Sequence, residues 1–388
     1  MVQPLDLSAI GVVDNHCHAL DAEQSTEGIS AWRARFTESP HDRMRREDAA
    51  ETAFYRRLMR RLAVHLGLPA ESDEAAVLAE RDRRSAAELT TGIYAGAGIS
   101  GVVIDTGYPP PETAMAREDY RAATGVARVD LLRLELLFQD LLAAHDRWDD
   151  VVEALRHRLA DLRGQGFAGF KSIAGYRTGL GIERWSDGDV GASFAAVRRE
   201  ATETGAVHLG HKPVLDSLLH VSLAAAAAQE LPVQFHVGYG DPDADLRHAN
   251  PLELRAVLEE PAYRAVPIVL LHGCWPYFRE GAYLAAVYEN AYLDLSYGIP
   301  FLSTGELTSM TRAALGSAPF TKLMYSSDGT RVPELHWMGA VEGRTAIGRV
   351  LAELVDDGDL STDQAMTAAD QVLGGTAWRL YGFPGSRS

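Results

Sequence analysis

Short blocks of Val, Ile, Leu, Phe and Tyr recur along the chain, and each is bounded by turn residues rather than spaced as on an amphipathic helix. Such blocks are typical of strands that are buried on both faces. Segments with helical spacing, such as residues 148–166, lie between them. This alternation predicts a parallel sheet, and eight units predict one α/β domain over 1–388, a closed (β/α)8 TIM barrel. The blocks cover residues 10–18, 99–107, 125–135, 166–174, 231–240, 267–275, 291–296 and 322–329.

Two connections are much longer than the few residues and one helix that usually join barrel strands. Residues 20–97 are rich in Arg, Glu and Ala and should form successive helices, and residues 175–230 include an Ala-rich helix. Both helical insertions, one after strand 1 and a long one after strand 4, follow strand C-termini, where barrels keep their active sites. We therefore predict that 20–97 is a helical cap over the barrel mouth. The capping pattern of Ser361 and Gln364 predicts a closing helix near the C-terminus.

The net charge of the chain limits the kinds of molecule that we expect it to bind. The chain has 37 Lys and Arg against 54 Asp and Glu, a net charge of -17, which argues against nucleic acid and against an anionic membrane surface. Its first ten residues lack the basic start and apolar run of a signal peptide, and no apolar run approaches the roughly 18 residues of a membrane span. We expect a cytoplasmic protein that acts on a small-molecule substrate. Assembly into a homo-oligomer is left open.

Metal-ligating side chains gather at the predicted strand ends. His16 and His18 lie two apart at the end of the first strand, so the strand period places both side chains on one face and Cys17 on the other. Because strand C-termini ring one mouth of a barrel, these histidines should converge with the residues that end later strands. Imidazole and carboxylate favour zinc, manganese or iron over calcium or magnesium, with zinc the first choice. The later residues are His236, His272 and Asp328 on strands 5, 6 and 8.

Lys171 ends the fourth strand and allows more than one interpretation. A plain lysine there binds a substrate carboxylate or reaches solvent. A lysine buried beside metals has its neutral amine favoured by desolvation and by nearby positive charge. Such an amine combines with carbon dioxide to give a carbamate, whose two oxygens bridge a pair of metals. We expect Lys171 to be carboxylated in this way.

Taken in order, D-N-H-C-H at 14–18, Lys171, His236, His272 and Asp328 resemble the signature of the amidohydrolase superfamily, and the match runs from residue 10 to about 382. The C-terminal GGTAWRLYGF is similar to the closing helix of its amidohydrolase-2 type. Three stretches are similar to the amidohydrolase found alone or fused to a glutamine-synthetase-like domain. These stretches are residues 169–180, 231–241 and 272–290.

The resemblance implies one or two divalent metals per chain. It implies that a first metal is held by His16, His18, His236 and Asp328. A second metal would use Lys171 and His272. Many relatives of this type work with one metal and leave the strand-6 histidine free for catalysis, so the metal count stays open.

The leading hypothesis is hydrolysis of the C–N bond of a small amide by metal-activated hydroxide, with Asp328 as proton shuttle and His272 as a second catalytic residue. The glutamine-synthetase association suggests a γ-glutamyl amide by analogy. One alternative is a metal-dependent decarboxylase or isomerase of a small carboxylate, and another is a catalytically silent regulatory barrel. Asp14 shares the inward parity of the histidines and should orient one of them. Substrate contacts are expected from Tyr176, Arg177, Glu135 and Asp241.

Overall fold

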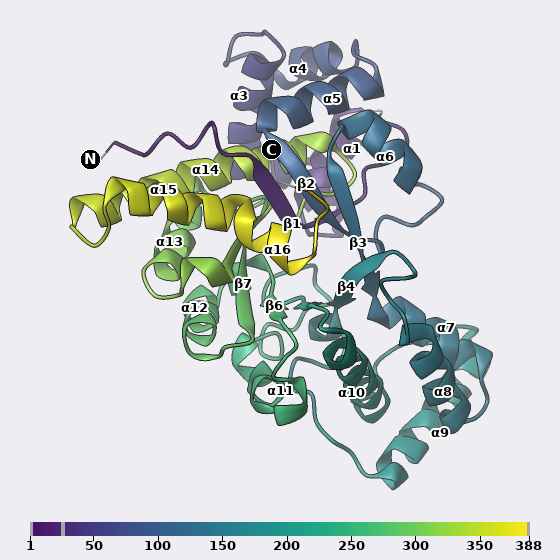
Figure 1. Cartoon of the computed structure of the whole chain (residues 1–388). Helices are drawn as coiled ribbons and strands as arrows, with labels where there is room; N and C mark the ends of the chain where they lie inside the picture. The colour runs from purple at the N-terminus through teal and green to yellow at the C-terminus, as the bar shows by residue number, and fades with distance from the viewer. Residues whose placement is uncertain (1–2, 25–27, 386–388) are drawn as a thin grey trace.

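A single sheet of eight parallel strands, in the chain order β1 to β8, forms the centre of the molecule (Figure 1). The structure is a computed structural model that describes residues 3–24 and 28–385. Each strand falls inside one of the eight predicted hydrophobic blocks, and the TIM-barrel prediction is confirmed. The strands are β1 Val12–His18, β2 Ile99–Asp105, β3 Ala127–Arg133, β4 Phe167–Ser172, β5 Val233–Phe235, β6 Ile268–Leu270, β7 Ala291–Ser296 and β8 Leu323–Ser326.

Backbone hydrogen bonds between the end of β1 and the segment after β8 bring the two edges of the sheet together. The amide of Asp328 donates to the His16 carbonyl at 3.0 Å, and the amide of His18 donates to the Gly329 carbonyl at 2.8 Å. These bonds fix Asp328 beside the two histidines of β1.

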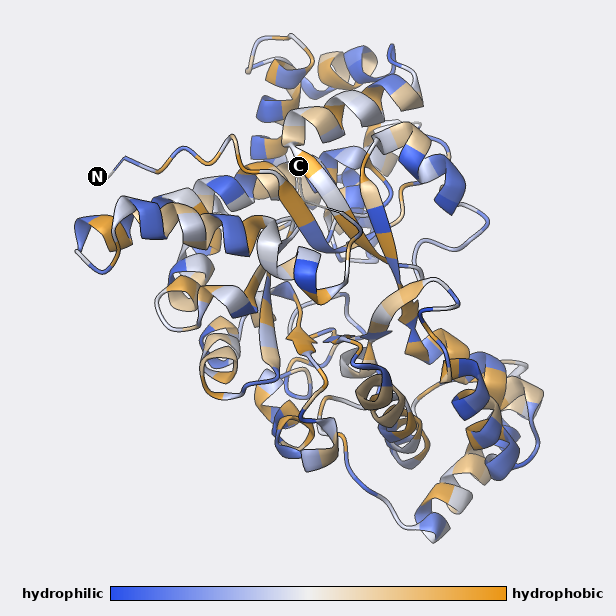
Figure 2. Ribbon diagram, in the orientation of Figure 1, coloured by the Kyte–Doolittle hydropathy of each residue, from blue (hydrophilic) through white to orange (hydrophobic). Residues whose placement is uncertain are grey.

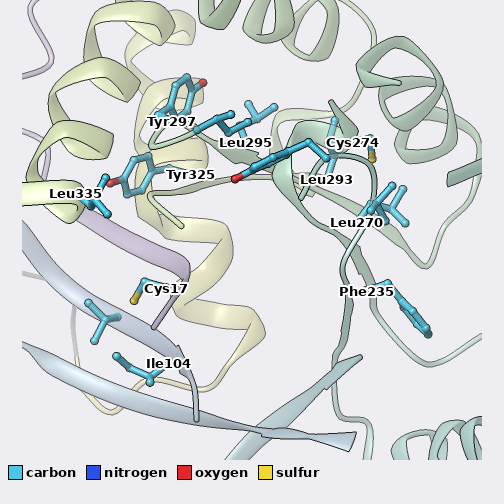
Figure 3. Packing of buried hydrophobic residues seen from close by; sticks show 14 of the residues in the cluster. Cys17, Ile104, Phe235, Leu270, Cys274, Leu293, Leu295, Tyr297, Tyr325 and Leu335 are labelled. Carbon is cyan, nitrogen blue, oxygen red and sulfur yellow. The ribbon is translucent and has the colours of Figure 1, made fainter. Parts of the chain in front are cut away.

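The strand period divides the side chains of the barrel between two apolar clusters. Val12 of β1 and Ile104 of β2 pack outward against the helices, whereas Val13 and Val103 point into the barrel. Figure 3 shows outward packing of this kind. Cys17 and Ile104 lie at the lower left of the view, and Leu335, of the helix after β8, lies above them at the left edge. The inward cluster also takes up Ala377, Tyr381 and Phe383, so the C-terminal segment fills part of the barrel interior.

Helices surround the barrel, and hydrophobic and hydrophilic residues mix on most of them (Figure 2). Among the described residues, none of the helices is both long and apolar enough to cross a membrane. Ser361 and Gln364 form the predicted capping box of α15. The helices after the first insertion are α6 Arg117–Thr124, α7 Leu134–Ala144, α8 Trp148–Leu159, α9 Asp187–Thr204, α10 Lys212–Gln229, α11 Arg255–Glu259, α12 Phe278–Val287, α13 Thr304–Leu315, α14 Pro333–Asp356, α15 Thr362–Asp370 and α16 Thr376–Leu380.

The first insertion is helical, and α14 anchors it through buried charges. Arg81 donates to Glu334 of α14 at 2.5 Å and to the carbonyl of Gln24 at 2.9 Å. Glu342, also on α14, pairs with two arginines of α3. In Figure 1, α3, α4 and α5 lie together beside β1 and β2. The helices of this segment are α1 Ile29–Arg33, α2 Asp42–Arg46, α3 Ala53–His65, α4 Glu74–Arg81 and α5 Ala86–Ala97.

The predicted role of Asp14 is wrong. A register irregularity in β1 between Asp14 and Cys17 interrupts the strand period. Asp14 accepts a hydrogen bond from the Ser327 amide at 2.8 Å and lies 3.6 Å from His336 of α14, so it contacts the helix layer instead of His16. The alternation holds only for a regular strand, and the irregularity lies between Asp14 and the histidine pair.

We predict that Arg81→Met lowers the free energy of unfolding by about 3–5 kcal/mol, because it leaves the carboxylate of Glu334 buried without its partner. The side chains of Arg81 and Glu334 are 1% and 0% exposed. Urea unfolding measures the change. The double variant Arg81→Met, Glu334→Leu should recover most of the loss, since neither charge then remains.

The matched control is Arg83→Met, whose side chain is 79% exposed in its pair with Glu80. This change should alter the free energy of unfolding by about 0.5 kcal/mol or less. Equal effects of the Arg81 and Arg83 changes would contradict the anchoring role of Arg81.

Candidate metal centre

Three imidazoles meet the carboxylate of Asp328 at the mouth of the barrel. Asp328 Oδ1 lies 3.4 Å from His16 Nε2 and 3.6 Å from His18 Nε2, and Asp328 Oδ2 lies 3.4 Å from His272 Nδ1. His16, His272 and Asp328 each offer a ligand atom within 4.8 Å of the others. The arrangement is the convergence of strand ends that the sequence predicts for these residues.

The two remaining predicted ligands join the same cluster. Lys171 Nζ lies 3.4 Å from His16 Nε2, and His236 Nδ1 lies 2.9 Å from His272 Nε2. His236 Nε2 is 2.6 Å from the carbonyl oxygen of Tyr239. The structure thus gathers all six residues, from β1, from β4 and from the segments that follow β5, β6 and β8.

Burial sets the protonation of this cluster. Burial lowers the pKa of His16 to about 4 and holds the pKa values of His236 and His272 well below the ordinary imidazole value. Burial opposes ionisation of Asp328, but His272 and hydrogen bonds from the β1 histidines hold the pKa of Asp328 well below its ordinary range. The imidazoles are therefore neutral and the carboxylate is ionised. These are the protonation states in which such groups bind metal.

Two observations fit the cluster to a divalent metal. His18 Nδ1 is buried and has no hydrogen-bond partner among the described residues, an arrangement that costs free energy unless another group satisfies the atom. His272 and Asp328 have positive φ angles of 62° and 53°, a conformation that is uncommon for residues other than glycine and that clusters at functional sites. The donor set of imidazole nitrogen and carboxylate oxygen matches zinc, manganese or iron.

Gln234 of β5 holds His16 in one orientation. Its carboxamide oxygen lies 2.8 Å from His16 Nδ1, and its amide donates to the carbonyl of Asn15 and to the hydroxyl of Tyr381, both at 2.8 Å. His16 Nε2 is therefore left to face Asp328. Sequence reasoning missed Gln234, although it shares the inward parity of His236 in an otherwise apolar strand.

Asp294 of β7 supports His272 in a comparable way. Its carboxylate accepts hydrogen bonds from the His272 backbone amide at 2.8 Å, from Ser296 at 2.8 Å and from Asn15 at 2.9 Å. The Ser296 hydroxyl lies 3.2 Å from His272 Nδ1. Burial raises the pKa of Asp294 to about 6, and the hydrogen bonds oppose this rise. A lone Asp between two leucines of a buried strand was the signal available for it.

Asp105 and Arg133, at the ends of β2 and β3, form a further charged pair at the site. Arg133 Nε lies 3.1 Å from both carboxylate oxygens of Asp105. Burial opposes the charge on Asp105, but Arg133 and His18 hold the pKa of Asp105 below its ordinary value. Asp105 Oδ2 is 3.9 Å from His18 Nδ1, so this carboxylate faces the unpartnered ring nitrogen. The sequence pattern predicted no metal ligand at the ends of β2 and β3.

A cavity of about 1020 Å³, which we call the main cavity, opens over the cluster. Four of the candidate ligands line this cavity: His18, Lys171, His236 and Asp328. Its walls include residues of the first insertion from 21 to 45, whereas α5 packs against α14 and α6 beside the barrel. A cap over 20–97 remains a prediction for the whole segment.

The four predicted substrate contacts lie in two environments. Tyr176, Arg177 and Asp241 line the main cavity. Glu135 is buried and accepts a hydrogen bond from Ser172 at 2.7 Å, and it is not among the residues that line the main cavity. Residues that the sequence did not single out also line this cavity. They include Asp21, Arg35, Glu38, Tyr108, Tyr239 and Arg331.

We predict that Gln234→Met weakens metal binding by about 10–100-fold, because His16 Nδ1 loses the partner that orients its ring. Competition with a chromogenic chelator measures the affinity. Tyr381→Phe keeps the Gln234 contact to His16 and removes one hydrogen bond behind it, so its effect should be several-fold smaller. Unchanged metal affinity in the folded Gln234→Met protein would refute this role.

Comparison of the sequence with known proteins finds a matching family and a similar protein. The family model described as Amidohydrolase matches residues 174–383. Protein fluG of Emericella nidulans is 35% identical over 252 residues, which are 62% of this chain and 29% of fluG, so the chain spans less than a third of that relative.

Two solved structures share the fold over nearly the whole chain. A Lactobacillus casei protein assigned as a metal-dependent hydrolase is 26% identical with a TM-score of 0.87, and the match covers 98% of both chains. A uronate isomerase of Bacillus halodurans has a TM-score of 0.65 at 15% identity, and the match covers 97% of this chain and 94% of that one. The second similarity shows the fold alone.

Proposed function

Because the chain belongs to the amidohydrolase family, we propose that it is a metal-dependent enzyme that hydrolyses the C–N bond of a small amide. The observation that carries the proposal is the convergence of three imidazoles on the ionised carboxylate of Asp328 beneath a cavity of about 1020 Å³. Sites of this composition suit metal-assisted hydrolysis, in which one group must accept a proton and later return it.

In this proposal His16, His18, His236 and Asp328 hold a first divalent metal, for which zinc is the first choice and manganese and iron are the alternatives. Lys171 and His272 hold a second. A bound metal supplies Lewis acidity, which activates water and polarises the scissile carbonyl. The low imidazole pKa values support this assignment, since the neutral rings need no deprotonation before binding.

Asp328 transfers the proton from water to the leaving amine in the proposed reaction. Its depressed pKa keeps it ionised at neutral pH, so it accepts a proton from the attacking water and passes it to the nitrogen of the leaving amine. The hydroxyl of Tyr239 donates to Asp328 Oδ2 at 2.6 Å and fixes the carboxylate in position. His272 contributes to the same step if only one metal is bound. Tyr176, Arg177 and Asp241 contact the substrate in the main cavity.

A γ-glutamyl amide is the substrate that we place first. Arg35 and Arg331 line the cavity wall and both donate to Asp21, at 2.9 Å and 3.0 Å. These guanidinium groups suit a carboxylate on the acyl half of the substrate. The glutamine-synthetase association supports the same class by analogy.

A metal-dependent isomerase or decarboxylase of a small carboxylate is the alternative. The fold is shared with the uronate isomerase, which leaves this alternative open, and the guanidinium groups at the cavity wall suit any small carboxylate. The product decides between the reactions, because hydrolysis releases an amine and the alternatives do not. A catalytically silent regulatory barrel would release nothing.

We predict that the double variant His16→Ala, His18→Ala loses amide hydrolysis by more than about 100-fold, since changes to groups that only support metal ligands already cost 10–100-fold. Amine release from a panel of γ-glutamyl and simple amides measures the activity, and elemental analysis measures metals per chain. His157→Ala, a change on α8 away from the barrel mouth, is the control. A double variant that keeps its full metal content would contradict the ligand assignment.

We predict that Lys171 carries a carbamate that bridges two metals. Burial lowers the pKa of Lys171 to about 8, which makes the neutral amine accessible near neutral pH. An ammonium beside two dications would be opposed by repulsion and desolvation, so a second metal and a protonated Lys171 should exclude each other.

Lys171→Ala should therefore lose the second metal and most activity, and short carboxylic acids should restore part of both. Carbon-13 NMR of protein equilibrated with labelled bicarbonate detects the carbamate directly. Full activity with one metal and an unmodified Lys171 would refute this prediction and leave His272 free for acid–base catalysis.

A further inference from the structure

A second cavity, of about 360 Å³, adjoins the main one. Glu38, Tyr239 and Asp241 line both cavities, so the two meet along these side chains. Its remaining wall is largely apolar. We call it the aromatic cavity, and its principal residues are Tyr239, Leu246, Trp275 and Phe301 with Glu38 and Asp241.

Three aromatic rings form its walls at defined angles. The ring of Phe301 lies 5.4 Å from that of Tyr239, with 85° between their planes, and 5.3 Å from that of Trp275, with 60° between them. Phe301 is 38% exposed, so a large apolar surface is left uncovered there. Aromatic rings attract a cation that lies over their faces.

The rings belong to the same segments as the candidate metal ligands. Tyr239 follows His236 after β5, and Trp275 follows His272 after β6. The hydroxyl of Tyr239 donates to Asp328 Oδ2 at 2.6 Å, while its ring packs edge-on against Phe301. One side chain therefore separates the proton-carrying carboxylate from the aromatic cavity.

The titratable side chains that line this cavity are acidic, apart from Tyr239. None of the described residues that line it is Lys, Arg or His. Glu38 has no ion pair within residues 3–24 and 28–385, and Asp241 accepts the backbone amide of Asp243 at 2.9 Å. Burial raises the pKa of Asp241, against the hydrogen bond from the Asp243 amide and the charge of Arg177 in the main cavity. Glu38 and Asp241 thus line the aromatic cavity, whose described lining residues include no basic side chain.

We infer that the aromatic cavity binds the amine half of the substrate, and that this half carries an organic ammonium group on a short hydrocarbon chain. The inference rests on the proposed amide hydrolysis. Aromatic faces and carboxylates attract a cation, while Trp275, Phe301 and Leu246 cover its hydrocarbon.

The position next to Asp328 fits the direction of the reaction. Hydrolysis breaks the C–N bond, the acyl carbon receives the hydroxyl of water, and the nitrogen receives the proton through Asp328. The released amine then lies beside Tyr239, with its distal ammonium group in the aromatic cavity. The enzyme would therefore convert an ω-ammonium alkyl amide into a carboxylic acid and a diamine.

Calorimetric titration of the metal-loaded protein tests this binding without turnover. The probes are butyltrimethylammonium, which cannot coordinate a metal, 1-pentanol and pentanoate. Burial raises the pKa of Glu38 to about 7, so titration at pH 8 keeps this carboxylate charged. We expect the cation to bind at least about tenfold more tightly than the alcohol, with no measurable binding of pentanoate at this site. Equal affinity for the cation and the alcohol would overturn the inference.

Variants locate the binding site. Phe301→Ala and Glu38→Gln should each weaken binding of the cation about tenfold at unchanged metal content. Tyr283→Ala is the matched control, because Tyr283 is an aromatic residue on α12, is 57% exposed and does not line the cavity. Undiminished binding in both cavity variants would refute the site.

Turnover then separates this inference from the proposed function. If the cation binds as described but no amide is hydrolysed, the proposed function fails and the ammonium site stands. If neutral alkyl amides are hydrolysed as fast as ω-ammonium amides, and Phe301→Ala affects both equally, the ammonium site fails and the proposed function stands.

Discussion

The hydrogen bonds between β1 and the segment after β8 are the constraint on which the site depends. They fix the backbone of Asp328 to that of His16, and they hold the Gly329 carbonyl on the amide of His18. This backbone pairing brings the Asp328 carboxylate within reach of both imidazoles of β1. Closure of the barrel and assembly of the candidate metal centre are in this respect the same event.

The barrel interior combines a polar part and an apolar part. Inward residues nearer the strand ends form a charged cluster that is costly to bury unless every group is paired. Gln234 spans the two parts, since it contacts His16 on one side and Tyr381 of the C-terminal segment on the other. The C-terminal segment therefore does more than complete the fold. Its Tyr381, which follows α16, supports a candidate ligand from inside the barrel.

The sequence predicted the strands because each is a dense apolar block, and it predicted the convergence of six residues because barrel topology brings strand ends together. It could not predict departures from regular geometry. The irregularity in β1 places Asp14 against Ser327 and His336, and no sequence pattern marks it. Gln234, Asp294 and Asp105 were missed for a different reason. Single polar residues in apolar strands are visible in the sequence, but their partners are set only by the three-dimensional packing.

We propose that the strand-end cluster is a metal centre. Diffraction from crystals of the metal-loaded protein, recorded on both sides of the zinc absorption edge, locates the metal. We expect anomalous density among His16, His18, His236 and Asp328, with a second peak shared by Lys171 and His272 if two metals are bound. Density elsewhere, or none at this cluster in protein that is active, would contradict it.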